Sequence, residues 1–143
     1  MMLLLAATLV GCNKEGKDKG PDSIDEKLVG EWVLTEWNGE TPEFVVYIDF
    51  NKDTTFAIYQ QVWSLDYQMF EGTCRSKKGI LSGSYADGSA WATDYKYSVS
   101  GSKLTLTSQD GTSVKSVYEK CEIPAEVIAE ATTTRSAEVV PFL

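Results

Sequence analysis

Histidine is absent from this sequence of 143 residues. Its absence excludes the Ser-His-Asp and Cys-His mechanisms, the commonest general base, and most zinc and copper sites, because these depend on an imidazole ring. An enzyme made from this chain would depend on carboxylates, and the acids within predicted strands are Asp49, Asp66, Glu71 and Asp94. A glycosidase needs two carboxyl groups that face each other at a set separation, and the spacing pairs none of these four. We therefore expect no catalytic residue, no cofactor and no metal site.

Basic residues are also scarce, with 13 Lys and Arg against 21 Asp and Glu and a formal net charge of −8. Residues 13–22 hold equal numbers of acidic and basic side chains, so this charge lies in residues 23–143. Phosphate binding needs clustered Lys and Arg, so an acidic domain argues against nucleic acid as a partner. It argues equally against direct adsorption to anionic lipid, and solubility is the simpler explanation of the charge.

No segment approaches the run of about 20 apolar residues that a membrane-spanning helix needs. The longest run, Met1–Val10, matches the hydrophobic region of a signal peptide, although no Lys or Arg precedes it. A short buried strand or helix is the alternative. The polar, lysine-containing stretch that follows is typical of a flexible tether, which favours the signal-peptide interpretation.

Residues Leu9-Val10-Gly11-Cys12 resemble the lipobox of bacterial lipoprotein precursors. The resemblance implies cleavage before Cys12 and acylation of its sulfur and new amino group by palmitate-type chains, and two or more such chains anchor a protein stably. We therefore expect a signal peptide at 1–11, a lipidated Cys12 with its tether at 12–22, and one folded domain at 23–143. The expected location is the bacterial cell envelope, at the outer membrane on its periplasmic or exposed side, with the membrane as a partner through the anchor.

Within the domain, apolar side chains alternate with period two over eight short segments that turn signals separate. This spacing fits a barrel or a sandwich, and the short connections favour pairing between neighbours in the sequence. We therefore predict an all-β fold, an eight-stranded antiparallel up-and-down barrel. The expected strands are residues 31–35, 44–50, 54–62, 65–74, 80–85, 91–99, 104–106 and 112–121.

Short segments flank the predicted strands. Residues 23–26 have the spacing of a capping box, which indicates a helical turn before the first strand. Pro124–Ala129 reads as the start of a short C-terminal helix, with proline in the first turn and Glu126 near the positive end of the helix dipole. The apolar residues Val139–Leu143 would pack across the domain or form a further short strand.

Residues Leu28-Val29-Gly30-Glu31-Trp32 are similar to the Gly-x-Trp opening of lipocalin-type barrels. The segments 81–85, 103–106 and 118–120 also resemble small bacterial lipocalin-like (calycin) lipoproteins, so that the resemblance spans about residues 24–121. It implies that Gly30 permits a sharp turn into the barrel and that Trp32 plugs its closed end. The helix after the last strand looks shorter than in vertebrate lipocalins, and their transport and receptor roles are not implied.

The cysteines other than Cys12 are Cys74 and Cys121, an even pair. Many lipocalins join the fourth strand to the segment after the barrel by a disulfide, and these two residues lie in comparable places. The resemblance thus implies a candidate disulfide between Cys74 and Cys121. Two free, buried thiols are the alternative, because the sequence cannot show whether the two Cα atoms come within reach.

The inward side chains either fill the barrel or line a cavity, since an eight-stranded barrel has room for side chains or for one small ligand. The tyrosines favour a cavity, because each brings an apolar ring and a hydroxyl that needs a partner, whereas Phe or Leu would build a solid core more simply. Several hydroxyls within one apolar cavity would orient an amphipathic guest. The residues expected to line it are Phe44, Phe56, Tyr67, Met69, Tyr95, Tyr97 and Tyr118.

The sequence therefore predicts a lipid-anchored binding module that holds a small apolar or amphipathic ligand. The alternative is a packed barrel whose loops dock onto another protein, as an envelope subunit or a protease inhibitor. Trp63, between the third and fourth strands, and Trp37, beside the turn at Asn38-Gly39, would lie exposed at the mouth or fold over its rim. A cavity of roughly 300 Å³ or more favours the ligand, and a filled barrel with a contiguous apolar rim favours docking.

Overall fold

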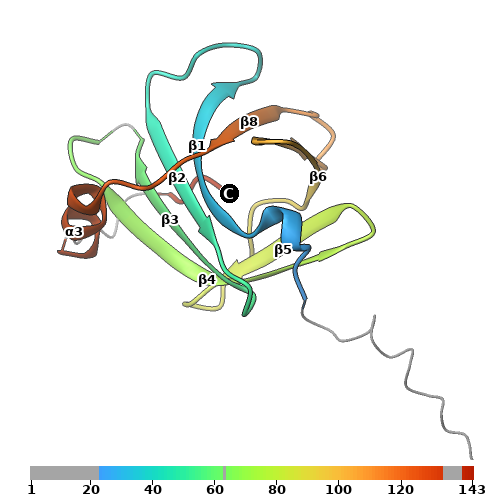
Figure 1. The fold of residues 1–143 in the computed structure, drawn as a ribbon, viewed down its shortest axis with the longest axis horizontal. Coiled ribbons are helices and arrows are strands. Elements are labelled where there is room, and N and C mark those ends of the chain that lie inside the picture. The colour runs from blue at the N-terminus through green and yellow to red at the C-terminus, as the bar shows by residue number, and fades with distance from the viewer. Residues whose placement is uncertain (1–22, 63, 134–139) are drawn as a thin grey trace, which may run out of the picture.

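The computed structural model describes residues 23–62, 64–133 and 140–143 and contains one closed barrel. Each strand pairs antiparallel with the next, and the last pairs back onto the first (Figure 1). The predicted eight-stranded up-and-down barrel with a short C-terminal helix is confirmed. The elements are η1 (Glu26–Leu28), β1 (Gly30–Trp37), β2 (Val45–Phe50), β3 (Thr55–Gln61), β4 (Gln68–Lys77), β5 (Ile80–Tyr85), β6 (Tyr95–Ser100), β7 (Lys103–Ser108), β8 (Lys115–Lys120) and α3 (Ala125–Thr133). The signal peptide, Cys12 and Trp63 of the sequence prediction lie outside the described residues.

The inward faces of the strands form one apolar core, as the period-two alternation predicts. The strand register places inward residues side by side, for example Trp32 beside Ile48 and Ile48 beside Ile58. The largest fully buried side chains within the barrel are Trp32, Tyr118, Phe50, Phe56, Leu28, Ile48, Ile58, Leu81, Leu104 and Leu106.

The face of β4 that points into the barrel is opposite to the face that we expected to do so. Its register pairs Phe70 with the inward residue Ile58, whereas Tyr67 and Met69 belong to a second, outer cluster beneath α3. The prediction that Tyr67 and Met69 face the interior was wrong because both faces of this strand carry apolar residues. The alternation fixes the period of a strand, but the packing of the helix decides which face lies outside.

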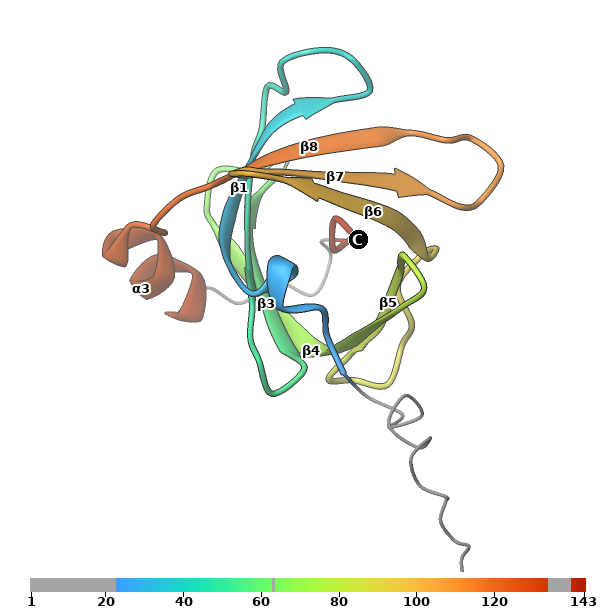
Figure 2. The same ribbon diagram turned by 45° about the vertical axis from the view of Figure 1, so that its right-hand side comes forward.

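Helix α3 packs on the outer face of β3 and β4, outside the ring of strands (Figures 1 and 2). It begins at Ala125, one residue after the predicted start at Pro124, and the Val127 and Ile128 amides both donate to the Pro124 carbonyl. Ala57 and Tyr59 of β3 lie buried in the cluster that the helix covers. Among the described residues, no helix combines the length and the apolar character needed to cross a membrane.

One end of the barrel is closed by Trp32, which is fully buried. Its indole Nε1 donates to the Leu28 carbonyl at 2.9 Å, and the Lys120 ammonium lies 4.6 Å from the ring centroid while donating to the Val29 carbonyl at 2.8 Å. Gly30 has a φ of 135°, which L side chains rarely adopt, and an added Cβ would also strike the Lys120 ammonium. Gly30 thus turns the chain into β1, and Trp32 is buried at the start of that strand.

The pairing of β5 with β6 is the shortest in the barrel. The paired residues are Ile80 with Lys96 and Leu81 with Tyr95. The connection between these strands folds back onto β5, where the Trp91 amide donates to the Gly83 carbonyl at 3.0 Å. Gly83 is needed at this position, because a Cβ would fall on the Trp91 ring. An aromatic side chain therefore covers the barrel wall where the two strands separate.

Cys74 and Cys121 are both free thiols. Cys74 lies in the core inside the barrel, whereas Cys121 lies in the outer cluster beneath α3. A disulfide needs Cα atoms within about 7 Å and side chains that point toward each other, and side chains on opposite faces of the sheet do not meet this condition. The disulfide that the resemblance implied is therefore wrong, and the alternative of two free thiols holds.

Candidate functional site

A cavity of about 370 Å³ lies at the end of the barrel opposite Trp32. We call this cavity the mouth cavity. Inward residues of β1, β6, β7 and β8, together with residues next to β2 and β3, form most of its wall. Its lining residues are Trp37, Phe44, Val62, Ala92, Thr93, Tyr95, Ser108, Asp110, Thr112, Val114, Ser116, Val140, Pro141 and Phe142.

One wall of the mouth cavity is aromatic. The rings of Trp37 and Phe44 meet edge to face with centroids 5.5 Å apart, and Phe142 lies 5.7 Å from Phe44 and 6.3 Å from Trp37. Trp37 keeps 39% of its surface exposed at the rim. Such rings bury a large apolar area in fixed geometry, so this wall suits an apolar group.

A second wall of the mouth cavity is polar. The Ser108 hydroxyl lies 3.1 Å from the Asp110 carboxylate and 3.0 Å from the Thr112 hydroxyl, and it accepts the Val114 amide at 3.0 Å. Hydrogen bonds from Thr112 lower the pKa of Asp110, which keeps this carboxylate ionised. Burial raises the pKa of Tyr95 to about 12, and the charge of Asp110 acts in the same direction. Tyr95 therefore keeps its proton at neutral pH and presents a hydroxyl donor.

Below the mouth cavity the barrel is packed with rings. Phe56 contacts Trp91 with centroids 5.2 Å apart and Tyr85 at 5.7 Å, and Trp91 lies 5.9 Å from Tyr95. Tyr118 is fully buried beneath them, and burial raises its pKa. The barrel is thus filled at its closed end and hollow at its mouth.

The described C-terminal residues lie inside the barrel, and both views place this end within the ring of strands (Figures 1 and 2). The Gln60 side chain donates from Nε2 to the Val140 carbonyl at 3.0 Å and accepts the Phe142 amide at Oε1 at 2.7 Å. The Tyr85 hydroxyl donates to the Leu143 oxygen at 2.8 Å, and Leu143 is buried in the core. We call residues 140–143 the tail segment; it packs inside the domain, forms no strand, and walls one side of the mouth cavity.

The residues predicted to line a ligand cavity are distributed over four places. Phe44 and Tyr95 line the mouth cavity. Phe56 and Tyr118 belong to the packed core beneath it. Tyr97 is half-buried and turns toward the closed end, where its hydroxyl donates to the carboxylate of Asp25, the N-cap of η1, at 3.0 Å. The two remaining residues, Tyr67 and Met69, lie outside the barrel as described above.

Sequence reasoning missed Gln60, Tyr85, Ser108 and Ser116, all of which are buried inside the barrel. A signal was present for Gln60: it continues the inward row of Phe56 and Ile58, and a polar residue in such a row needs a partner. No comparable signal marks the two serines, which are common on either face of a strand.

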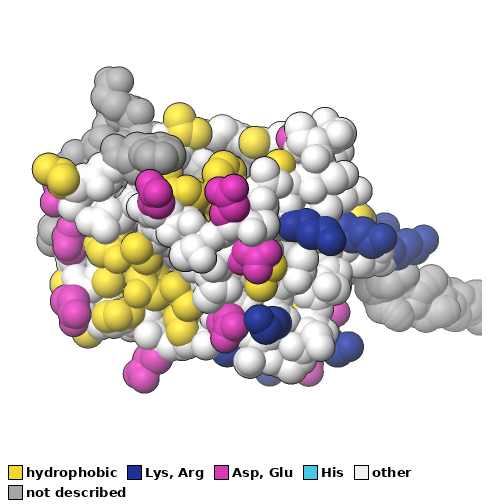
Figure 3. Space-filling model, turned by 90° about the horizontal axis from the view of Figure 1, so that it is seen from above, with side chains coloured by type: hydrophobic (Ala, Val, Ile, Leu, Met, Phe, Trp, Pro, Cys, Tyr) yellow, Lys and Arg dark blue, Asp and Glu magenta, His cyan; other side chains and the backbone are white. Residues whose placement is uncertain are grey.

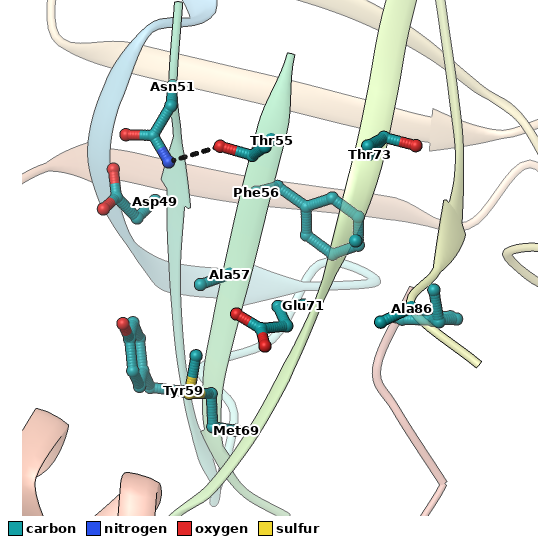
Figure 4. A pocket seen from close by; sticks show the side chains of 12 residues that line it. Asp49, Asn51, Thr55, Phe56, Ala57, Tyr59, Met69, Glu71, Thr73 and Ala86 are labelled. Atoms are coloured by element: carbon teal, nitrogen blue, oxygen red, sulfur yellow. Dashed lines mark hydrogen bonds between the residues drawn. The ribbon is translucent and has the colours of Figure 1, made fainter. Parts of the chain in front are cut away.

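A second hollow of about 440 Å³ lies on the outer face of β2, β3 and β4 (Figure 4). The register aligns Asp49 with Ala57 and Ala57 with Glu71, so that two carboxylates project on either side of a small residue. Burial, followed by the charge of Glu31, raises the pKa of Asp49. The sequence did not predict this pair, because its members lie on strands that β3 separates. In the described part of the chain, no group of three Cys, Asp or Glu side chains could hold a metal ion.

Comparison with known proteins gives one family match: residues 28–126 match the model of the lipocalin-like domain. This stretch contains all eight strands and the start of α3. No curated protein matches the chain at a significant level.

The fold is shared with solved structures, including two from Bacteroides species. A lipocalin-like protein from Bacteroides uniformis is 19% identical, with a TM-score of 0.52, and the match covers 66% of this chain and 99% of that one. An uncharacterized protein from Bacteroides eggerthii is 18% identical, with a TM-score of 0.50, and the match covers 65% of this chain and 98% of that one. At these identities the likeness concerns the fold alone.

Proposed function

Because the chain belongs to the lipocalin-like domain family, we propose that it is a lipid-anchored binding module of the cell envelope that holds a small apolar or amphipathic ligand in its mouth cavity. Members of this family are typically binding proteins rather than enzymes. The observation that carries the proposal is the mouth cavity itself, whose volume of about 370 Å³ falls within the range of roughly 300–1,000 Å³ that is usual for small-molecule sites.

The two walls of the mouth cavity define the chemistry of the ligand. The aromatic wall of Trp37, Phe44 and Phe142 would take the apolar part. The hydroxyl of Tyr95 on the polar wall would orient a polar group. Apolar burial supplies most of the affinity in such sites, and a few hydrogen bonds fix the orientation.

The distribution of charge supports attachment to a membrane by way of Cys12. Lys and Arg side chains gather at one end of the molecule (Figure 3), on the turns and strand ends around the closed end of the barrel, where the described chain also begins. The connections around the mouth carry acidic residues instead, namely Glu40, Glu43, Asp66, Asp87, Asp94 and Asp110. Acids such as Asp25, Asp53 and Glu119 lie among the basic residues at the closed end, so the acyl chains on Cys12 would supply the attachment. A barrel anchored through its N-terminal side would rest on its closed end with the mouth turned away. The basic residues at the closed end are Lys27, Lys52, Arg75, Lys77, Lys78, Lys103 and Lys120.

No chemical step is part of this function. The chain has no histidine, and the two carboxylates that the fold brings to one face, Asp49 and Glu71, lie on the outside of the barrel and away from the mouth cavity. Binding without chemistry agrees with both observations.

A second candidate function is docking of a protein on the rim of the mouth. Leu65, in the connection between β3 and β4, is 91% exposed, and Trp37 at the same end is 39% exposed. Large exposed apolar side chains are typical of interaction sites when they are contiguous. The mouth cavity favours the ligand over this candidate, because a docking barrel has no need of an interior space.

Native mass spectrometry of the protein purified from its own cell extract tests the proposal. We expect a stoichiometric small-molecule adduct on the wild type and on Leu65→Ser, which changes the rim alone. Ser116→Phe fills the mouth cavity and should remove the adduct, while circular dichroism shows that it folds. Bare protein in all three samples would contradict the ligand proposal, and loss of a co-purified protein from Leu65→Ser would favour docking.

A further inference from the structure

Two hydrogen bonds hold the tail segment through its main chain, so they do not require particular side chains in that segment. Gln60 donates to one carbonyl and accepts one amide two residues further along, at 3.0 and 2.7 Å. A side-chain amide that pairs with both a carbonyl and an N–H recognises an extended backbone as a neighbouring strand does. Gln60 is itself fully buried, so this pairing takes place away from water.

Two consecutive side chains of the tail segment pack against the interior of the barrel. Phe142 completes the aromatic wall with Trp37 and Phe44. Leu143 is buried to 3% exposure and its oxygen receives the Tyr85 hydroxyl at 2.8 Å. Val140 lines the mouth cavity and is 77% exposed. Main-chain pairing combined with side-chain pockets is how proteins bind extended peptides.

From these contacts we infer that the barrel mouth is a recognition site for an extended apolar peptide, and that the tail segment occupies it as an intramolecular ligand. This inference goes beyond the proposed function: the peptide would take the place of the tail segment, whereas the small ligand would take the mouth cavity that lies beside that segment. A peptide bound at this site must offer one main-chain carbonyl and one amide to Gln60, followed by an oxygen to the Tyr85 hydroxyl. The apolar requirement is an aromatic residue and then an aliphatic one, in the order of Phe142 and Leu143.

Occupation of the site by the tail segment should lower the apparent affinity of the wild-type protein for a peptide in solution. A segment that belongs to the same chain as its site acts at a high effective concentration. A peptide in solution must compete with it, and the apparent affinity falls by the fraction of molecules whose site is open. The wild-type protein should therefore bind such a peptide weakly, and a protein with a weakened tail segment should bind it well.

The test uses the full chain and a fluorescein-labelled synthetic peptide, Val-Pro-Phe-Leu, read by fluorescence anisotropy. The double substitution Phe142→Ser and Leu143→Ser weakens the intramolecular contacts, and we expect it to bind the peptide at least about tenfold more tightly than the wild type. Ala125→Ser is the control, because this residue lies exposed at the start of α3 and does not line the mouth cavity, and this variant should bind as the wild type does. Equal affinity for the double variant and the wild type would overturn the inference.

Two further measurements separate this inference from the proposed function. Gln60→Leu, placed in the double variant, should weaken peptide binding at least about tenfold while leaving binding of the apolar dye anilinonaphthalene sulfonate unchanged, because the dye has no backbone for Gln60 to pair with. If the double variant binds the dye but not the peptide, the peptide inference fails and the proposed function stands. If the folded double variant binds neither, both fail.

Discussion

Two tyrosines inside the barrel should respond in opposite directions to the same substitution. Tyr118 is fully buried, and no described residue pairs with its hydroxyl. Tyr85 is also buried, but its hydroxyl donates to the Leu143 oxygen at 2.8 Å. Replacing each tyrosine by phenylalanine removes one oxygen and keeps the ring. We expect Tyr118→Phe to stabilise the protein and Tyr85→Phe to destabilise it.

The magnitudes follow from the cost of burying an unpaired polar group, about 1–3 kcal/mol in proteins. Tyr118→Phe removes that cost from the folded state and leaves a small void in return, so we expect the free energy of unfolding to rise by about 1–2 kcal/mol. Tyr85→Phe leaves the Leu143 oxygen without its donor and should lower the free energy of unfolding by about 1–2 kcal/mol. The two variants should therefore differ by about 2–4 kcal/mol.

Urea unfolding followed by tryptophan fluorescence measures both changes, and the slope m should stay constant because the exposed surface is the same. Tyr97→Phe is the control: its hydroxyl pairs with the half-exposed Asp25 carboxylate at 3.0 Å, where water can replace the lost partner, so the change should stay below about 1 kcal/mol. A loss of stability in Tyr118→Phe would refute the reasoning, because it would mean that the buried hydroxyl has a favourable partner.

Two other predictions concern alkaline pH and the membrane anchor. Burial raises the pKa of Cys74 from 9.0, and that of Tyr95 from 10.0, to about 12 in each case. Both groups are neutral when protonated and hold the proton more tightly when folded, so the stability that they contribute is complete below pH 9 and is lost as the pH rises toward 12. Urea unfolding at pH 8, 9, 10 and 11 should show this decline, and Cys74→Ala should reduce it between pH 9 and 10; a flat profile would be evidence against it. For the anchor, Cys12→Ser should move the protein from the membrane pellet to the soluble fraction in cell fractionation, since the acyl chains supply the attachment. Retention of Cys12→Ser in a salt-washed pellet would rule out this role for the cysteine.

The alternation of apolar residues is enough to predict most of the barrel. Val46, Ile48 and Phe50 face inward as predicted, because only one face of β2 meets an apolar interior along most of its length. The prediction failed at β4, where Tyr67 and Met69 are as apolar as the inward residues. What decides the outcome there is α3, an element that lies about 60 residues further along the chain.

The site was less predictable than the fold, for the same physical reason. Phe44 and Tyr95 are strand residues whose direction the period determines, and they line the mouth cavity. The tail segment has only its apolar character to indicate burial, and the partner that fixes its position, Gln60, lies 80 residues away from Val140. Cys74 and Cys121 show the same limit, because the sequence does not reveal that the sheet separates them.

The short junction between β5 and β6 makes the barrel unequal in strength around its circumference. Only two residues of each strand are paired at this junction. Thermal or mechanical stress would therefore separate β5 from β6 before any other pair of strands. Opening there would leave an eight-stranded sheet with β5 and β6 as unpaired edge strands. Unpaired edge strands tend to pair with another molecule. Aggregation in concentrated or heated samples would then proceed by edge-to-edge pairing of these strands. A covalent cross-link between β5 and β6 would therefore suit a form of the protein intended for long storage.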